Sequence, residues 1–237
     1  MLETINLSKR FGGLKAVNSV SLHVDRGEIY GLIGPNGAGK TTFLNTISGM
    51  YIPDGGKVLF DGIDMTVQKP HRFCHRGMAR TYQIVRSFPQ MTVLENTLIG
   101  GIFGAGLNRT DAVKKAHEML KFVEFPFTPE TPVHTLNTMQ LKRLELARAL
   151  CTGCKMLLLD EMAAGLTPGE LVDITRLMFQ IRDNMGITII IVEHLMKLIM
   201  DVSDRISVLH FGEKLIEGAP AEIIADEEVQ RAYLGDT

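Results

Sequence analysis

Short runs of apolar and β-branched residues alternate with segments of helical periodicity along much of the chain. The runs Glu28–Ile33, Met156–Asp160 and Ile187–Val192 have the length of strands and are apolar nearly throughout. Buried strands of a parallel sheet have this pattern. The apolar spacing also predicts helices over Lys40–Ser48 and Pro168–Met185. The alternation therefore predicts an α/β fold with a parallel sheet.

Two stretches of the chain do not follow this alternation. Residues 1–27 and 55–65 have the pattern of antiparallel strands, with Asp61-Gly62 as a hairpin turn. Residues 84–152 are mainly helical, and the expected helices are Thr92–Gly100, Asp111–Val123 and Leu141–Leu150. We therefore expect a P-loop core that carries an antiparallel β subdomain and an inserted helical subdomain.

The expected organisation is a single domain over residues 1–237. Residues 1–83 and 153–237 would form the catalytic core with its antiparallel β part, and residues 84–152 the helical subdomain. The 237 residues are 45% hydrophobic and 22% charged, which is ordinary for a globular protein and excludes a disordered or fibrous one.

Charge, cysteine content and hydropathy each exclude a class of function. The formal net charge of -2 gives no electrostatic footprint for nucleic acid, so no nucleic-acid partner is expected. Three cysteines are too few for a disulfide framework, and Cys151 and Cys154 have no second ligand pair for zinc, so we expect structural thiols in a reducing compartment. No signal peptide is recognisable, and no apolar run reaches the ~18 residues that span a bilayer. A membrane would be reached only through a partner.

One Gly-rich segment carries the strongest chemical signal. The order Gly34-Pro35-Asn36-Gly37-Ala38-Gly39-Lys40-Thr41, followed by Thr42, matches the phosphate-loop pattern in full. Glycines let backbone N–H groups turn towards the β- and γ-phosphates, and the helix that begins near Lys40 adds the positive end of its dipole. The Lys40 ammonium adds a point charge, and the Thr41 hydroxyl is placed to bind Mg²⁺. No Asn-Lys-x-Asp motif for reading guanine is present, which favours ATP over GTP.

Two carboxylates, Asp160 and Glu161, stand at the end of a predicted strand. Adjacent strand residues point to opposite faces, so the two side chains can take different roles. Asp160 is expected to hold Mg²⁺ through its water shell, and Glu161 to polarise the attacking water. Acidic residues often end strands, so the pair alone is weak evidence for a catalytic site. Together with the phosphate loop it becomes strong evidence.

Together these residues resemble the ATP-binding subunit of an ABC transporter. The similarity extends from Phe11 to residues 231–235 and includes Gln83, the Asp160-Glu161 pair and His194. Three segments are similar to the versions found in the ATPase subunits of branched-chain amino-acid importers, namely Gly77–Gln83, Phe88–Asn96 and Glu161–Pro168.

The resemblance implies a role for each matching position. Phe11 would stack on adenine, and Gln83 would reach Mg²⁺ and the attacking water. His194 would contact the γ-phosphate and hold Glu161, so that Glu161, His194 and Gln83 form the catalytic set. On the residues alone, Phe11 could instead be a core residue, and a single His at a strand end is more often structural.

The family signature, Leu-Ser-Gly-Gly-Gln at the start of a helix, is altered in this chain. It aligns with Leu136–Gln140, in which only the first and last residues remain. In the family this helix N-terminus faces ATP held by the opposite subunit, so Asn137 and Gln140 would contact that nucleotide. Thr138 and Met139 hinder the close approach that glycine allows. We therefore favour a heterodimer with a second ATP-binding subunit that has an intact signature, and a homodimer stays open.

The resemblance further implies an ATPase that powers an importer, peripheral to the cytoplasmic face of the inner membrane. Its partners would be integral membrane permease subunits and, indirectly, a solute-binding protein. The cargo would be branched-chain or other hydrophobic amino acids, which no residue of this chain would touch. Two alternatives stay open: the ATPase of a lipopolysaccharide-type ABC exporter, and a regulatory subunit that binds ATP with little hydrolysis.

Overall fold

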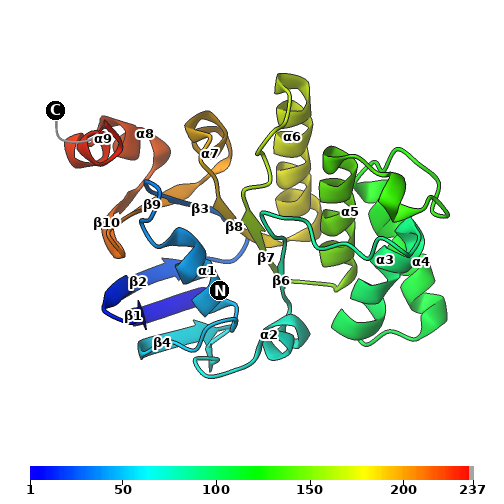
Figure 1. The fold of residues 1–237 in the computed structure, drawn as a ribbon, viewed down its shortest axis with the longest axis horizontal. Coiled ribbons are helices and arrows are strands. Elements are labelled where there is room, and N and C mark those ends of the chain that lie inside the picture. The colour runs from blue at the N-terminus through cyan, green and yellow to red at the C-terminus, as the bar shows by residue number, and fades with distance from the viewer. Residues whose placement is uncertain (235–237) are drawn as a thin grey trace.

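The computed structural model describes residues 1–234, which contain two sheets (Figure 1). The larger sheet has six strands in the order β10-β9-β3-β8-β7-β6. Their bounds are β3 Ile29–Ile33, β6 Met78–Arg80, β7 Met156–Asp160, β8 Thr188–Val192, β9 Arg205–His210 and β10 Glu213–Gly218. All neighbouring strands pair in parallel except the edge strand β10. The predicted α/β fold with a parallel sheet is confirmed.

The smaller sheet is antiparallel and has the strand order β2-β1-β4-β5. Its strands are β1 Leu2–Phe11, β2 Leu14–Val24, β4 Gly55–Phe60 and β5 Ile63–Asp64. The chain turns from β4 to β5 at Asp61 and Gly62, whose φ angles of 54° and 74° suit a tight hairpin. This agrees with the antiparallel part and the turn expected from the sequence.

Helix α1 (Lys40–Ile47) lies between the two sheets (Figure 1). Its Phe43, Leu44 and Ile47 are fully buried in a core cluster with residues of both sheets. Strand β3 contributes Tyr30 to this cluster and Ile29 to a second cluster on the other face of the larger sheet. Alternate residues of a strand point to opposite faces, so a strand covered on both sides is apolar throughout.

The second cluster packs the larger sheet against helices that the sequence placed only in part. Helix α6 spans Pro168–Met185, with the bounds expected from its apolar spacing, and α7 spans Met196–Val202. Like α7, the short elements α2 (Pro70–Arg76), α8 (Pro220–Ala225) and α9 (Glu227–Leu234) were given no bounds from the sequence. Segments of six to eight residues contain too few turns for an apolar period to be recognised.

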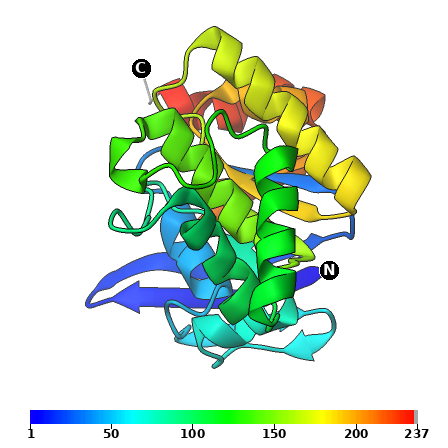
Figure 2. The same ribbon diagram turned by 90° about the vertical axis from the view of Figure 1, so that its right-hand side faces the viewer.

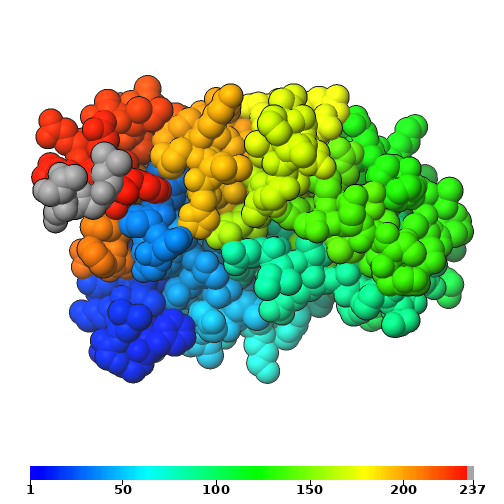
Figure 3. Space-filling model, turned by 45° about the horizontal axis from the view of Figure 1, so that its top comes forward, coloured from blue at the N-terminus to red at the C-terminus, as the bar shows by residue number. Residues whose placement is uncertain are grey.

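The helices within residues 84–152 gather at one end of the molecule, at the right of Figure 3, and this end faces the viewer in Figure 2. Helix α5 (Thr138–Cys151) packs against both α3 (Val93–Ile99) and α4 (Arg109–Phe122). A π-helical turn, Gly100–Gly104, follows α3. Helix α5 begins earlier than the expected Leu141 because Asn137 caps it.

The cysteines are free thiols in the interior or close to it. Burial raises the pKa of Cys151 to about 11 and that of Cys154 to about 12, which suits packing rather than reactivity. In residues 1–234, no group of three or more His, Cys, Asp and Glu side chains is placed to hold a metal ion. No helix of this part of the chain is long and apolar enough to cross a membrane.

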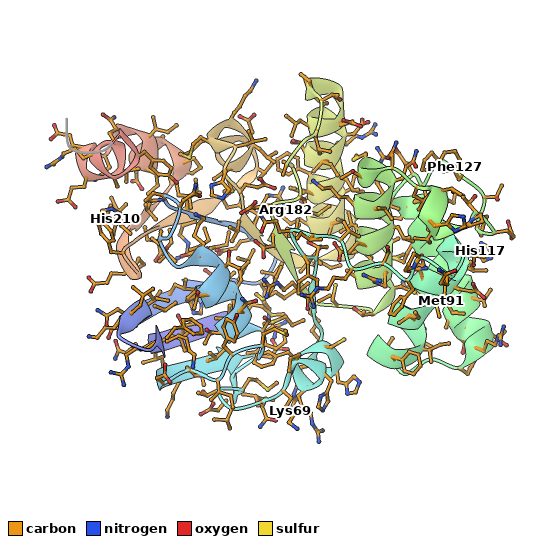
Figure 4. All side chains as sticks on the ribbon, in the orientation of Figure 1. Lys69, Met91, His117, Phe127, Arg182 and His210 are labelled. Atoms are coloured by element: carbon orange, nitrogen blue, oxygen red, sulfur yellow. The ribbon has the colours of Figure 1, made fainter. Side chains whose placement is uncertain are left out.

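The position of α1 between the sheets generates a stability prediction. We expect Phe43→Ala to lower the free energy of unfolding by about 3–5 kcal/mol, because it leaves a cavity between both sheets. Phe127→Ala is the matched control, since Phe127 is 48% exposed at the outer end of the helical group (Figure 4). Urea unfolding followed by circular dichroism measures both, and equal losses would contradict the prediction.

Candidate functional site

The predicted phosphate loop joins β3 to α1, and its glycines are fixed by their surroundings. Gly34 has a φ of 149° and Gly39 a φ of 100°, a region that side chains disfavour. A Cβ at Gly34 would clash with the carbonyl oxygen of Leu209, and one at Gly39 would clash with that of Ala16. Both positions therefore require glycine because of backbone conformation and close packing.

The loop presents donors towards the cavity that it encloses. No side chain caps the N-terminus of α1, so the first-turn N–H groups can serve an anion. The Lys40 ammonium, whose residue is 6% exposed, donates to the carbonyl oxygens of Gly34 at 2.7 Å and Pro35 at 3.0 Å. Burial lowers the pKa of Lys40, while Glu161 and Asp160 act in the opposite direction. The ammonium is thus held across the loop, in reach of a phosphate.

Asp160 ends β7 inside a small cavity with two further predicted Mg²⁺ ligands. One carboxylate oxygen, Oδ2, accepts a hydrogen bond from Arg80 Nη2 at 2.8 Å. The other, Oδ1, is buried and has no hydrogen-bond partner among the described residues. Thr41 and Gln83 line the same cavity, which measures about 250 Å³. The cavity thus contains an unpaired carboxylate oxygen, a hydroxyl and a side-chain amide, which are oxygen ligands of the kind that Mg²⁺ prefers, and the guanidinium groups of Arg80 and Arg86 also line it.

Glu161 lies where three segments of the chain meet. Its Oε1 accepts a hydrogen bond from His194 Nε2 at 2.9 Å, and its Oε2 accepts one from Gln83 Nε2 at 2.6 Å. The backbone N–H of Glu161 donates to the carbonyl oxygen of Val192 at 2.9 Å. Its φ of 51° is left-handed, which costs a residue with a side chain about 1–3 kcal/mol. Surrounding contacts therefore hold the carboxylate in a specific place.

The cavity at the phosphate loop has a volume of about 430 Å³. Its walls combine Asn36 to Thr42 of the loop and α1 with Glu161, His194 and Phe11. Phe11 is 45% exposed and packs edge-on against Tyr51, with ring centroids 5.3 Å apart. This is a surface aromatic ring at the cavity rather than a core residue, and Lys9 Nζ lies over it, 5.7 Å from the ring centroid.

Phe211 is a cavity residue that the sequence analysis missed. It is 82% exposed, has a φ of 46° and lines the same cavity. It follows β9, whose carboxyl end lies beside β3 and the phosphate loop. The only sequence signal was a large aromatic residue directly before Gly212, a pair that is common in turns.

Asn137 and Gln140 lie apart from this cavity. They form a capping box at the start of α5, in which Gln140 N–H donates to Asn137 Oδ1 at 3.0 Å and Asn137 N–H donates to Gln140 Oε1 at 2.9 Å. Neither residue lines the phosphate-loop cavity. The structure therefore does not bring them to the nucleotide site of their own chain.

Comparisons with known proteins agree with this geometry. Residues 17–164 match the family model described as ABC transporter, and residues 213–237 match that of the branched-chain amino acid ATP-binding cassette transporter. The chain is 39% identical to the high-affinity branched-chain amino acid transport ATP-binding protein BraF of Pseudomonas aeruginosa, with 100% of this chain and 98% of the relative covered. It is 38% identical to LivG of Escherichia coli K12, a protein of the same description, with the same coverage.

Solved structures give the same result. A nucleotide-free ATP-binding cassette from an ABC transporter is 33% identical, with a TM-score of 0.89 over 100% of this chain and 99% of that one. A cassette in its ADP conformation is 32% identical, with a TM-score of 0.88 and the same coverage. The chain therefore belongs to the ABC transporter family and is a relative of the branched-chain amino acid transport ATP-binding proteins.

Proposed function

We propose that this chain is the ATP-hydrolysing subunit of an importer for branched-chain or other hydrophobic amino acids. The main support is the position of Glu161, held by His194 and Gln83 at the wall of the phosphate-loop cavity. A carboxylate base beside a complete phosphate loop is unnecessary in a subunit that only stores ATP. It therefore favours hydrolysis over a purely regulatory role.

ATP binding in this proposal uses groups that already face the cavity. Backbone N–H groups of the phosphate loop and the Lys40 ammonium bind the β- and γ-phosphates. Phe11 and Phe211 offer aromatic faces to the base. Mg²⁺, held by Thr41, Gln83 and Asp160, would neutralise charge on the phosphate oxygens.

Hydrolysis in this proposal is an in-line attack by water. Glu161 takes a proton from the water while the water oxygen bonds to the γ-phosphorus, and the bond to the β–γ bridging oxygen breaks. The products are ADP and inorganic phosphate. His194 and Gln83 hold the two carboxylate oxygens, which keeps the base aimed at one position.

The permease subunits would dock at a groove of about 400 Å³. The inserted helices would then transmit motion between the permease subunits and the nucleotide site. The groove lies between α2, β6, α5 and the π-helical turn, and Met50 and Phe103 are exposed apolar residues that line it. Glu145 of α5 also lines it and accepts a hydrogen bond from the backbone N–H of Tyr82 at 3.2 Å. Tyr82 directly precedes Gln83, so a shift of Glu145 in the groove would also move the side-chain amide of Gln83.

Docked on permease subunits, this chain would work at the cytoplasmic face of the membrane.

The altered signature supports a second ATP-binding subunit as partner. A relative that is 26% identical, with a TM-score of 0.84, has been solved as a dimer bound to ADP and Pi. In this chain Thr138 and Met139 stand in the first turn of α5, where side chains keep a partner's phosphate at a distance. We therefore expect ATP bound here to face an intact signature on a different chain.

Replacing the proposed base tests hydrolysis. In the complex with the partner ATP-binding subunit, we expect Glu161→Gln to reduce the rate of MgATP hydrolysis at this chain's site by about 10²–10⁴-fold, the usual contribution of a general base, while ATP still binds. Glu130→Gln, at an exposed acidic position, is the control and should retain the wild-type rate. Release of phosphate and binding of a fluorescent ATP analogue measure the two properties. A Glu161→Gln protein with near wild-type turnover would refute the proposed role.

Light scattering tests the partner. We expect the Glu161→Gln chain with MgATP to stay near 26.2 kDa, because its own signature cannot clasp a second ATP. Adding the changes Asn137→Ser, Thr138→Gly and Met139→Gly restores the family signature and should double the mass. A doubled mass without these three changes would show that a homodimer forms and would exclude the heterodimer requirement.

A further inference from the structure

The loop that follows Glu161 is held by two buried charged side chains, Lys142 and Glu193. Lys142 Nζ donates to the carbonyl oxygens of Met162 at 2.8 Å and Ala164 at 2.6 Å. Glu193 Oε1 accepts a hydrogen bond from the backbone N–H of Ala163 at 2.7 Å. Three consecutive residues therefore bind an ammonium through two carbonyl groups and a carboxylate through the amide between them.

Both side chains are far more buried than charged groups usually are. Lys142 is 5% exposed and Glu193 is 3% exposed. Burying a charge is costly unless it is paired and hydrogen-bonded. The charges of Lys142 and Glu193 attract each other. The negative charge of Glu161 repels Glu193 and attracts Lys142. A neutral side chain could fill the same space at lower cost, which points to a purpose other than packing.

The positions of these two residues connect them to the proposed base. Met162 directly follows Glu161 in the chain. Both sequence neighbours of Glu193 contact Glu161: the carbonyl oxygen of Val192 accepts a hydrogen bond from the Glu161 N–H, and His194 donates to the Glu161 carboxylate. Lys142 stands on α5, in the turn after its capped N-terminus. The left-handed backbone of Glu161 needs support on both sides. Contacts to the adjacent loop supply it.

We propose that Lys142 and Glu193 form a buried clamp on Met162–Ala164 that positions the Glu161 carboxylate and ties its place to helix α5. This inference rests on the proposed role of Glu161 as the base. Lys142 and Glu193 are positioning residues, since they act through the loop and touch neither nucleotide nor water. Movement of α5 then shifts the loop, and with it the base.

Hydrolysis of MgATP by the full chain in its assembled complex tests the clamp. We expect Lys142→Met to lower kcat by about 10- to 100-fold, since displacing a catalytic group by about 1 Å has this effect. KM for ATP should be unchanged, because the loop does not bind substrate. Lys142→Arg keeps a charged donor for both carbonyl groups and should recover most of the rate. Lys121→Met, at an exposed lysine of α4, is the control.

Three kinetic results would contradict the clamp. One is a wild-type kcat for Lys142→Met, which leaves the role of Glu161 untouched because Glu161→Gln tests that role separately. Another is a joint fall in kcat, ATP affinity and Tm that Lys142→Arg does not rescue, which identifies a purely structural lysine. In a Glu161→Gln background, Lys142→Met should cause no further loss of residual hydrolysis. An additional tenfold loss there would also contradict action through Glu161.

The pH dependence of stability tests the burial of the Glu193 carboxyl. Burial, with repulsion from Glu161, raises the pKa of Glu193 from 4.5 to about 7, while Lys142 and the N–H groups of Ala163 and His194 lower it. The folded state therefore binds the proton more tightly than the unfolded chain, so stability falls as the pH rises from about 4.5 to about 7. Between about pH 5 and pH 8, Tm should fall more for the wild type than for Glu193→Gln. Equal falls would contradict the raised pKa of the buried Glu193 carboxyl.

Discussion

The close contact of the phosphate loop with two neighbouring backbones is the constraint on which the rest of the site depends. Gly34 lies against the carbonyl of Leu209 in β9 of the larger sheet, and Gly39 against that of Ala16 in β2 of the smaller one. The loop therefore joins the two sheets as well as enclosing a cavity. A loop held in this way is already ordered by folding, so little conformational entropy is lost when a phosphate binds.

The remaining groups reach the loop because parallel strands end at one edge of the sheet. The phosphate loop leaves β3 there, and Gln83 follows β6, Glu161 follows β7, His194 follows β8 and Phe211 follows β9. Parallel α/β sheets bind ligands outside this edge. The same topology that buries the strands on both faces thus gathers side chains that lie far apart in the chain.

Glu161 shows how local strain is maintained. A left-handed residue with a long side chain would relax in isolation, but hydrogen bonds fix its N–H and both carboxylate oxygens. In the proposed mechanism these contacts aim the base, and the buried charges of Lys142 and Glu193 extend the support to the next loop. In this proposal, movement of α5 reaches the base through the loop, and movement of the groove reaches it through Glu145 and Tyr82.

The sequence by itself determined the features that depend on neighbours in the chain. The phosphate loop, the strands β3 and β7, the bounds of α6 and the Asp61-Gly62 turn all follow from short-range spacing. Only the tertiary structure decided the place of Phe211 at the cavity and the contacts of Lys142 and Glu193 with the loop. These contacts join segments far apart in sequence and depend on strand order, which no local pattern encodes.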